Sequence, residues 1–409
     1  MTTKDWVFSI ERGREKSATI RNRMLLVEKI EVIDDYTIKL HFKTPDATFK
    51  PYGGGPYIVS KAYFDRVGEE KFAMQPVGTG PYKFVRYVPG EYVDVERFED
   101  YWGEKPQVKE ARFYFVSEDT TRVAKLKAGE LDLIASVPFA SIKDLENNKA
   151  FKLAKSRPGF PTPTVVFDTL NPNVPWAKTK VRLAMAYAID YDAIVKDLLL
   201  DIPKRFAYLA PYELGYDPDV KPYQYNPDMA KKLLAEAGYP DGFSFRLNYL
   251  MTGRVPMIRE IAELLATYFE AIGIKTKLLG EEAGKFYAYR NVEVKKGNKG
   301  VYVSLSSVNC VAGGVDPVQF MFILLRTGAG FSQSADPDLD ILLDQARATP
   351  NDDARAALCQ AAVKMIHAKA PVIPLFSYVP IYAMKKNIDF TPTQKNPFNI
   401  IYLRNVKVK

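Results

Sequence analysis

Residues 226–278 alternate helix and strand signals and decide the fold class. They begin with NPDMAKKLLAEAGYP, residues 226–240. Asn226 is suited to cap a helix, Pro227 to occupy its first turn and Gly238 to end it. The residues that follow have, in order, a strand pattern, an apolar stripe at helical spacing and a second strand pattern: 245–250, 258–272 and 274–278. This succession predicts an α/β protein.

Hairpin signals are concentrated in the first third of the chain. Ile30–Phe42 alternates apolar and polar residues around Asp34-Asp35, and Tyr82–Phe98 does so around Pro89-Gly90. Helix and strand patterns alternate in the rest of the chain, with no repeat and no low-complexity linker. We therefore expect an α/β protein with an antiparallel-rich portion, built from two or more lobes that several short crossings join.

Composition excludes several classes of protein. The chain has 409 residues and a net charge of +8, but its basic residues are scattered, which argues against nucleic-acid binding. No apolar run approaches the ~18 residues that a membrane span requires. The two cysteines, Cys310 and Cys359, have neither zinc-site nor redox spacing and are expected to be small buried hydrophobic residues.

The common catalytic patterns are missing from the sequence. Only His41 and His367 are available for a nucleophilic triad, and their positions predict surface residues. Two histidines also disfavour a metal site made of several imidazoles. Gly280–Lys285 resembles a phosphate loop but is one residue short, and Phe286 stands where Ser or Thr would bind magnesium. Paired carboxylates lie at turns and helix starts, where capping explains them.

Six short segments, in a fixed order along the chain, point to a family. They are Gly78–Tyr82, Asp100–Gly103, Leu126–Asp132, Val181–Asp190, Asn226–Gly242 and Ala370–Leu375. Each alone is explained as a turn, a cap or a core helix. Together they resemble the family 5 extracellular solute-binding proteins of bacterial ABC importers, the dipeptide-, oligopeptide- and nickel-binding type. The resemblance covers essentially the whole chain.

The resemblance implies a type II periplasmic-binding-protein-like fold, in which two lobes joined by crossing strands enclose the ligand. The crossings would fall near Thr164–Thr169 and Ser377–Ala383. The expected domains are residues 1–77, the remnant of a small extra subdomain; residues 78–168 with 379–409, which form lobe I; and residues 169–378, which form lobe II.

The resemblance also bears on the start of the chain. Family members begin upstream, with an export signal and the opening strands of lobe I, whereas Lys4–Arg12 resembles an internal family segment. We therefore expect an N-terminally truncated chain whose lobe I is incomplete and whose sheet has an open edge. The first residues have no apolar signal-peptide core, which taken alone indicates a cytoplasmic protein. The family instead implies a periplasmic or cell-surface location for the intact protein.

The family's cleft loop has its counterpart in Val308–Phe320. Asn309, Cys310, Gly313 and Gly314 would line the ligand there, and the glycines would let it approach backbone N–H groups. Gly313 stands where peptide-binding relatives have an acidic residue that holds the peptide's amino group. Asn309 or Cys310 replaces the aromatic residue that usually precedes it.

Further candidates lie outside that loop. Arg254 follows the 245–250 strand, where it either clamps a carboxylate in a bidentate pair or is a solvated loop arginine. Phe167, Asp168 and Tyr378 lie at the expected crossings, where they either face the cleft or fill the hinge. Asp316 precedes Pro317 and is expected to cap a helix.

Together these features predict a non-catalytic receptor that captures a small solute, by default a peptide, and delivers it to the permease subunits of an ABC importer. Three alternatives stay open: the same role for an oligosaccharide or metal chelate, a cleft hydrolase that uses Asp168 and Asp316, and a remnant that binds nothing. We expect a monomer with no cofactor, no bound metal and no nucleic-acid partner, and membrane contact only through the permease.

Overall fold

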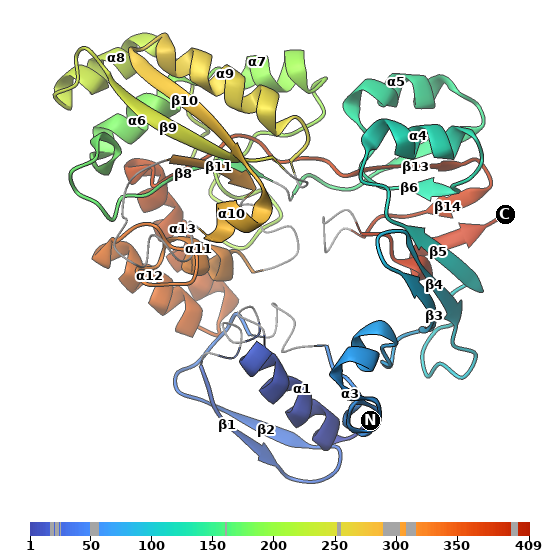
Figure 1. The fold of residues 1–409 in the computed structure, drawn as a ribbon. Helices are drawn as coiled ribbons and strands as arrows, with labels where there is room; N and C mark the ends of the chain where they lie inside the picture. The colour runs from blue at the N-terminus through green and yellow to red at the C-terminus, as the bar shows by residue number, and fades with distance from the viewer. Residues whose placement is uncertain are drawn as a thin grey trace. The chain divides into compact units, whose positions relative to one another are not determined.

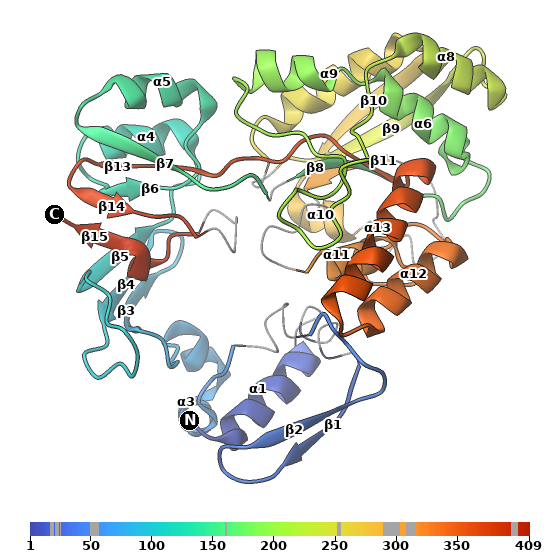
Figure 2. The same ribbon diagram turned by 180° about the vertical axis from the view of Figure 1, so that it is seen from behind.

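The computed structural model describes residues 1–16, 20, 24, 26–49, 57–159, 162–251, 255–288, 303–307, 316–393 and 400–409 (Figure 1, Figure 2). The chain divides into two compact units. One contains Met1–Ser156 and the described residues from Pro380 to the end, and the other is Arg157–Val379. The finer division into three domains that the sequence suggests stays a prediction.

Antiparallel strands dominate the unit that begins at Met1. Its strands are β1 (Val27–Val32), β2 (Ile38–Phe42), β3 (Tyr82–Val88), β4 (Tyr92–Arg97), β5 (Glu110–Tyr114), β6 (Leu133–Ile134), β7 (Phe151–Lys155), β13 (Ile381–Lys385), β14 (Ile388–Phe390) and β15 (Val406–Val408). They form the sheets β1-β2, β3-β4-β5, β6-β13-β7 and β14-β15. The two expected hairpins are confirmed, and Gly90 turns the second with a φ of 79°, which favours glycine. Its helices are α1 (Thr3–Lys16), α3 (Lys61–Met74), α4 (Asp119–Lys127), α5 (Phe139–Asn147) and the 3-10 turn η4 (Leu403–Asn405).

A five-stranded sheet organises the unit from Arg157 to Val379. Its strands are β8 (Pro163–Phe167), β9 (Phe243–Leu250), β10 (Ile274–Glu281), β11 (Val303–Ser307) and β12 (Val372–Pro374), and their spatial order is β10-β9-β11-β8-β12. β8 runs antiparallel to both of its neighbours, whereas the other four strands share one direction. The chain passes from one compact unit to the other at Ser156–Arg157. Thr164–Phe167 pair within the sheet, and the crossings expected from the sequence stay predictions.

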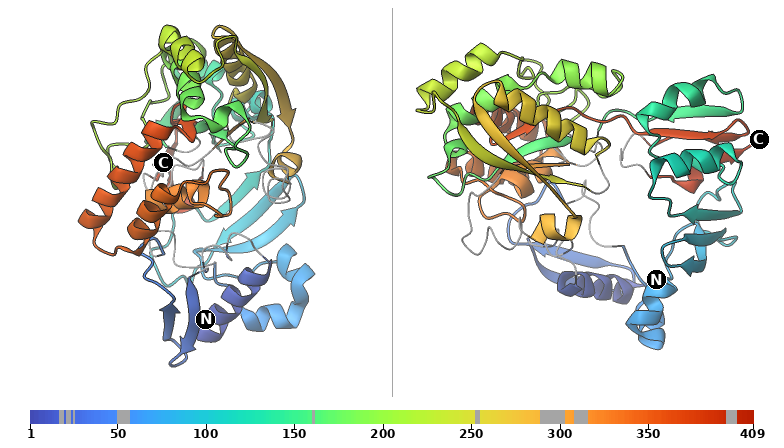
Figure 3. Two further views of the ribbon diagram at one scale, coloured as in Figure 1. Left: turned by 90° about the vertical axis from the view of Figure 1, so that its left-hand side faces the viewer. Right: turned by 45° about the horizontal axis from the view of Figure 1, so that its top comes forward.

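Helices cover both faces of this sheet. They are α6 (Thr179–Ala188), α7 (Tyr191–Ala193), α8 (Pro227–Glu236), α9 (Ile258–Glu270), α10 (Ala283–Ala288), α11 (Pro317–Leu325), α12 (Pro337–Ala348) and α13 (Asp352–Lys369), with a 3-10 turn η1 (Pro175–Ala177) and a π-helical turn η2 (Ile194–Leu198). On one face, the ring of Phe245 contacts Phe269 of α9 and Trp176 of η1. On the other, Val166 and Val372 join a buried cluster with α11, α12 and α13, and the last two helices run side by side (Figure 3).

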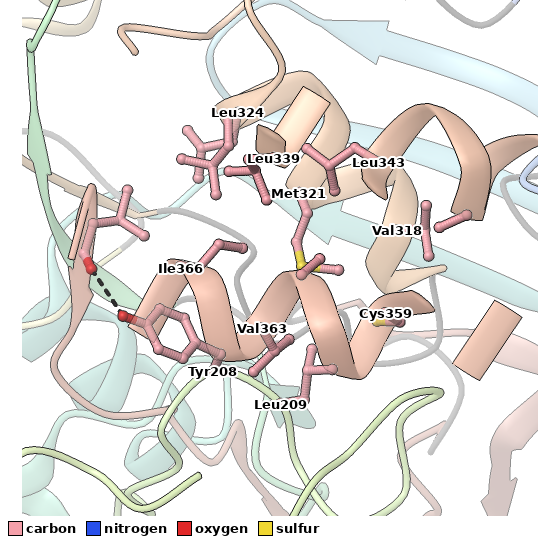
Figure 4. Packing of buried hydrophobic residues seen from close by; sticks show 14 of the residues in the cluster. Tyr208, Leu209, Val318, Met321, Leu324, Leu339, Leu343, Cys359, Val363 and Ile366 are labelled. Carbon is pink, nitrogen blue, oxygen red and sulfur yellow. Dashed lines mark hydrogen bonds between the residues drawn. The ribbon is translucent and has the colours of Figure 1, made fainter. Parts of the chain in front are cut away.

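The cluster below the second face shows how apolar burial holds the helices to the sheet. Met321 of α11 and Leu343 of α12 lie on one side of α13, Val363 lies beside Leu209 on the other side, and the Tyr208 hydroxyl donates to the Val372 carbonyl at 3.2 Å (Figure 4). Each buried side chain of this size contributes roughly 1.5–3 kcal/mol. Cys359 belongs to this cluster and is fully buried, as expected, whereas Cys310 lies outside the described residues.

Helix ends follow the local signals in the sequence. Asn226 accepts a hydrogen bond from the Met229 N–H at 2.9 Å, and Gly238 has a φ of 87° just after α8. Gly242, with a φ of 73°, lies so close to the Gly273 carbonyl that a Cβ would come within 1.8 Å of it. The expected cap and stop residues of α8 are therefore confirmed. Gly242, the residue just before β9, stands where only glycine fits.

The surface position expected for His367 is wrong. Its ring is half-buried and stacks on Tyr223 with centroids 4.4 Å apart, and the Tyr208 ring lies 6.0 Å away. Burial lowers the pKa of His367. The helical spacing of residues predicts that His367 faces away from the main apolar side of α13. The segment 208–223 packs on the side of the helix where His367 lies, and its Tyr208 and Tyr223 cover the ring.

Candidate functional site

The carboxyl ends of four strands define the edge of the five-stranded sheet at which we place the candidate site. β9, β10, β11 and β12 run in one direction, and ligands of open α/β sheets bind at this end of the strands. β9 and β11 are parallel neighbours, so both end at this edge. The segments that follow them contain the expected ligand-binding residues Arg254, Asn309, Cys310, Gly313 and Gly314, all of which lie outside the described residues.

Phe167 and Asp168 lie at the opposite edge. Phe167 pairs with Val303 at the start of β11, and Pro163 pairs with Ser307 at its end. The length of β11, about 13 Å at the usual rise per residue, therefore separates Phe167 from the carboxyl edge. Both side chains are buried, and the Asp168 carboxylate accepts a hydrogen bond from the Leu170 N–H at 3.1 Å. These contacts are structural, and a role of either residue in ligand binding stays a prediction.

Tyr378 contacts Pro256, which follows Arg254 closely in the sequence. Its hydroxyl donates to the Pro256 carbonyl at 2.5 Å, two residues after Arg254, and its own carbonyl accepts from the Gly159 N–H at 2.9 Å. The side chain is only 3% exposed, and burial raises the pKa of Tyr378 well above its ordinary value. Tyr378 therefore anchors the described end of this segment as a neutral phenol.

A buried ion pair anchors the segment that follows β11. The Asp316 carboxylate accepts from the Val318 N–H at 3.0 Å, which confirms the expected cap of α11. The same carboxylate accepts from the guanidinium of Arg355 on α13, which also donates to Asp352 at 2.8 Å. Burial raises the pKa of Asp316, although Arg355 acts in the opposite direction. The pair therefore ties the first described residue after this segment to α13.

Three buried polar side chains on one face of the sheet were not among the residues predicted from the sequence. Asn248 of β9 and Ser304 of β11 are each 1% exposed, and Glu281 at the end of β10 is 6% exposed. The Asn248 amide donates to Glu281 Oε2 at 2.7 Å. Asn248 and Ser304 occupy the polar positions of alternating strands, a pattern that predicts a solvent-facing side and does not indicate their burial. Arg355 gave no signal either, because its partner is 39 residues away in the sequence.

Within the described ranges, no three His, Cys, Asp or Glu side chains come together as a metal site would require. Among the helices of those ranges, none has the length and apolar character of a membrane span.

The sequence also matches a known family. The model of the bacterial extracellular solute-binding proteins, family 5 Middle, covers residues 1–332. The chain belongs to this family. It is 30% identical over 363 residues to heme-binding protein A of Haemophilus influenzae and 27% identical over 362 residues to the dipeptide-binding protein of Escherichia coli. These matches cover 86% and 85% of this chain but 64% and 66% of the relatives, so this family 5 chain spans less than two thirds of their length.

A solved structure confirms the fold of this family 5 chain. The ABC transporter-associated periplasmic binding protein DppA from Helicobacter pylori, in complex with the peptide STSA, matches with a TM-score of 0.85 at 25% identity. The match covers 100% of this chain and 81% of that one. The expected α/β fold of the periplasmic-binding-protein type is therefore confirmed.

Proposed function

We propose that this family 5 protein is the solute-binding component of an ABC importer and that its solute is a peptide. The family match over residues 1–332 carries the proposal. A dipeptide-binding relative and a peptide-bound structural neighbour support a peptide as the solute. The protein would act at the periplasm or cell surface as a monomer, and hand its solute to the permease subunits without chemical change.

The proposed binding residues are those at the carboxyl edge of the five-stranded sheet. Arg254 and Tyr378 come from the side of β9 and β12, and the residues after β11 are Asn309, Cys310, Gly313 and Gly314. A hydrolase would need the carboxylates of Asp168 and Asp316. Both already accept hydrogen bonds from groups of the protein, Asp168 from the Leu170 N–H and Asp316 from the Val318 N–H and the Arg355 guanidinium, which supports a non-catalytic site.

Recovery of bound solute tests this function. We would incubate the chain with Ala-Ala, glutathione, maltotriose and hemin, measure the thermal shift with each, and identify the bound compound by mass spectrometry. A solute at ~100 times its Kd stabilises the protein by ~2.7 kcal/mol. We expect Ala-Ala to stabilise the chain and to be recovered unchanged. Stabilisation by maltotriose or hemin alone would contradict the peptide, hydrolysed Ala-Ala would contradict the receptor role, and no stabilisation would contradict both.

A matched pair of arginine variants tests the site. Arg254→Ala should weaken Ala-Ala binding at least tenfold, because the guanidinium would pair with the peptide carboxylate. Arg259→Ala is the control, because this exposed arginine on α9 pairs with Glu263 at 3.0 Å. Equal affinity of the two variants would contradict the proposed role of Arg254.

A further inference from the structure

We propose that Asn248, Glu281 and Ser304 form a subsite for a positively charged nitrogen group of the solute. This inference rests on the proposed solute-binding function and deepens it. The subsite belongs to the Arg157–Val379 unit alone and consists of described residues.

The register of three adjacent strands brings these side chains together. Ser304 of β11 pairs with Asn248 of β9, and Asn248 pairs with Leu279 of β10. Glu281 follows Leu279 by two residues and therefore lies on the same face of the sheet. Neighbouring strands are about 4.8 Å apart, so the Asn248 and Ser304 side chains are adjacent. Glu281 is the last residue of β10, which places the group next to the carboxyl edge.

Hydrogen bonding in the group leaves acceptors to spare on both the amide and the carboxylate. The Asn248 amide nitrogen already donates to Glu281 Oε2 at 2.7 Å. Among the described residues, neither Asn248 Oδ1 nor Ser304 Oγ has a hydrogen-bond partner, although both side chains are 1% exposed. A carboxylate accepts about four hydrogen bonds, so Glu281 also retains capacity. A buried group with spare acceptors and one negative charge is complementary to an N–H donor that carries a positive charge.

In the part of the chain that the structure describes, the ion pair of Glu281 is a long one. Lys285 lies one turn on, with its Nζ 3.9 Å from Glu281 Oε1, and its side chain is 77% exposed. An exposed lysine at this distance from the carboxylate is largely screened by solvent. The other face of the same strands is apolar, since Phe245 and Leu247 are buried there. The polar group is therefore a local feature of one face, close to the edge at which a solute would bind.

Peptides with and without a free amine test this subsite by titration calorimetry. The probes are Ala-Ala, which has an α-ammonium, N-acetyl-Ala-Lys, which has only a side-chain ammonium, and N-acetyl-Ala-Ala, which has none. We expect at least one charged probe to bind the wild-type chain tenfold or more tightly than N-acetyl-Ala-Ala, and the tighter of the two identifies the source of the ammonium. Glu281→Gln should abolish this preference, and Glu282→Gln, its exposed neighbour, should preserve it.

The Ser304→Ala variant tests the subsite without the risk that a folding defect causes the lost preference. This hydroxyl lacks a described partner, so its removal should leave the melting temperature unchanged or higher while the ammonium preference falls several-fold. A preference that Glu281→Gln and Ser304→Ala leave intact would overturn the subsite and mean that the group holds a bridging water only, while peptide binding stands. Binding of no probe by the wild type would overturn the proposed peptide function as well.

Discussion

Replacement of Arg355 by methionine tests whether the Asp316–Arg355 pair holds the start of α11. Methionine keeps much of the apolar stem but removes the guanidinium. The Asp316 side chain, which is 2% exposed, would then retain, among the described residues, the N–H groups of Val318 and Gln319 as its donors. Loss of one partner of a buried ion pair costs about 3–5 kcal/mol. For a unit of this size, 1 kcal/mol corresponds to about 2–4 °C, so the melting temperature should fall by about 6–20 °C.

The loss in the Arg355→Met variant should depend on pH. Burial already raises the pKa of Asp316, and removal of Arg355 should raise that pKa further. With a folded-state pKa above the unfolded value of ~3.9, the penalty is complete above the folded pKa and disappears as the pH falls to the unfolded pKa. We therefore expect a smaller difference from wild type at pH 4 than at pH 7.

Urea unfolding followed by Trp176 fluorescence measures this loss in the Arg157–Val379 unit. Trp176 is buried there, and Trp6 and Trp102, in the other unit, would be replaced by phenylalanine. In the Arg355→Met/Asp316→Asn double variant, asparagine keeps the cap without the charge, so most of the stability should return. Equal losses at pH 4 and pH 7, or no recovery in the double variant, would refute the reasoning.

Three further variants test other parts of the same unit. Arg182→Met removes five hydrogen bonds, two of them to the Lys369 carbonyl at the end of α13, and should cost about 3 kcal/mol in urea unfolding, with Arg182→Lys intermediate. Gly242→Ala should cost at least ~2 kcal/mol, because its Cβ meets the Gly273 carbonyl at a φ of 73°; a loss below 0.5 kcal/mol would contradict this. Burial lowers the pKa of His367, so stability should fall as the pH drops below the unfolded pKa of ~6.5, and the loss is complete below the folded pKa. His367→Phe should remove this part of the pH dependence of the melting temperature between pH 5 and pH 8.

The candidate site was only partly predictable from the sequence. The cap at Asp316 was predictable, because the side chain of a helix cap accepts from N–H groups only two or three residues further along the chain. Phe167 was expected at a crossing, where it either faces the cleft or fills the hinge, but the sequence did not show that the antiparallel direction of β8 places it at the edge opposite the carboxyl ends of the other strands. A strand pattern shows which residues alternate across a sheet, yet it does not show the direction or the neighbours of the strand.

The sequence by itself determined the helix and strand pattern, the caps at Asn226 and Asp316, the α/β class and the family. These depend on local backbone chemistry and on segments whose order along the chain is fixed. The tertiary structure alone decided which distant side chains meet: Arg355 with Asp316, His367 with Tyr223, and Glu281 with Asn248. Strand order and helix packing minimise the free energy of the whole unit, so no local window of sequence contains these pairs.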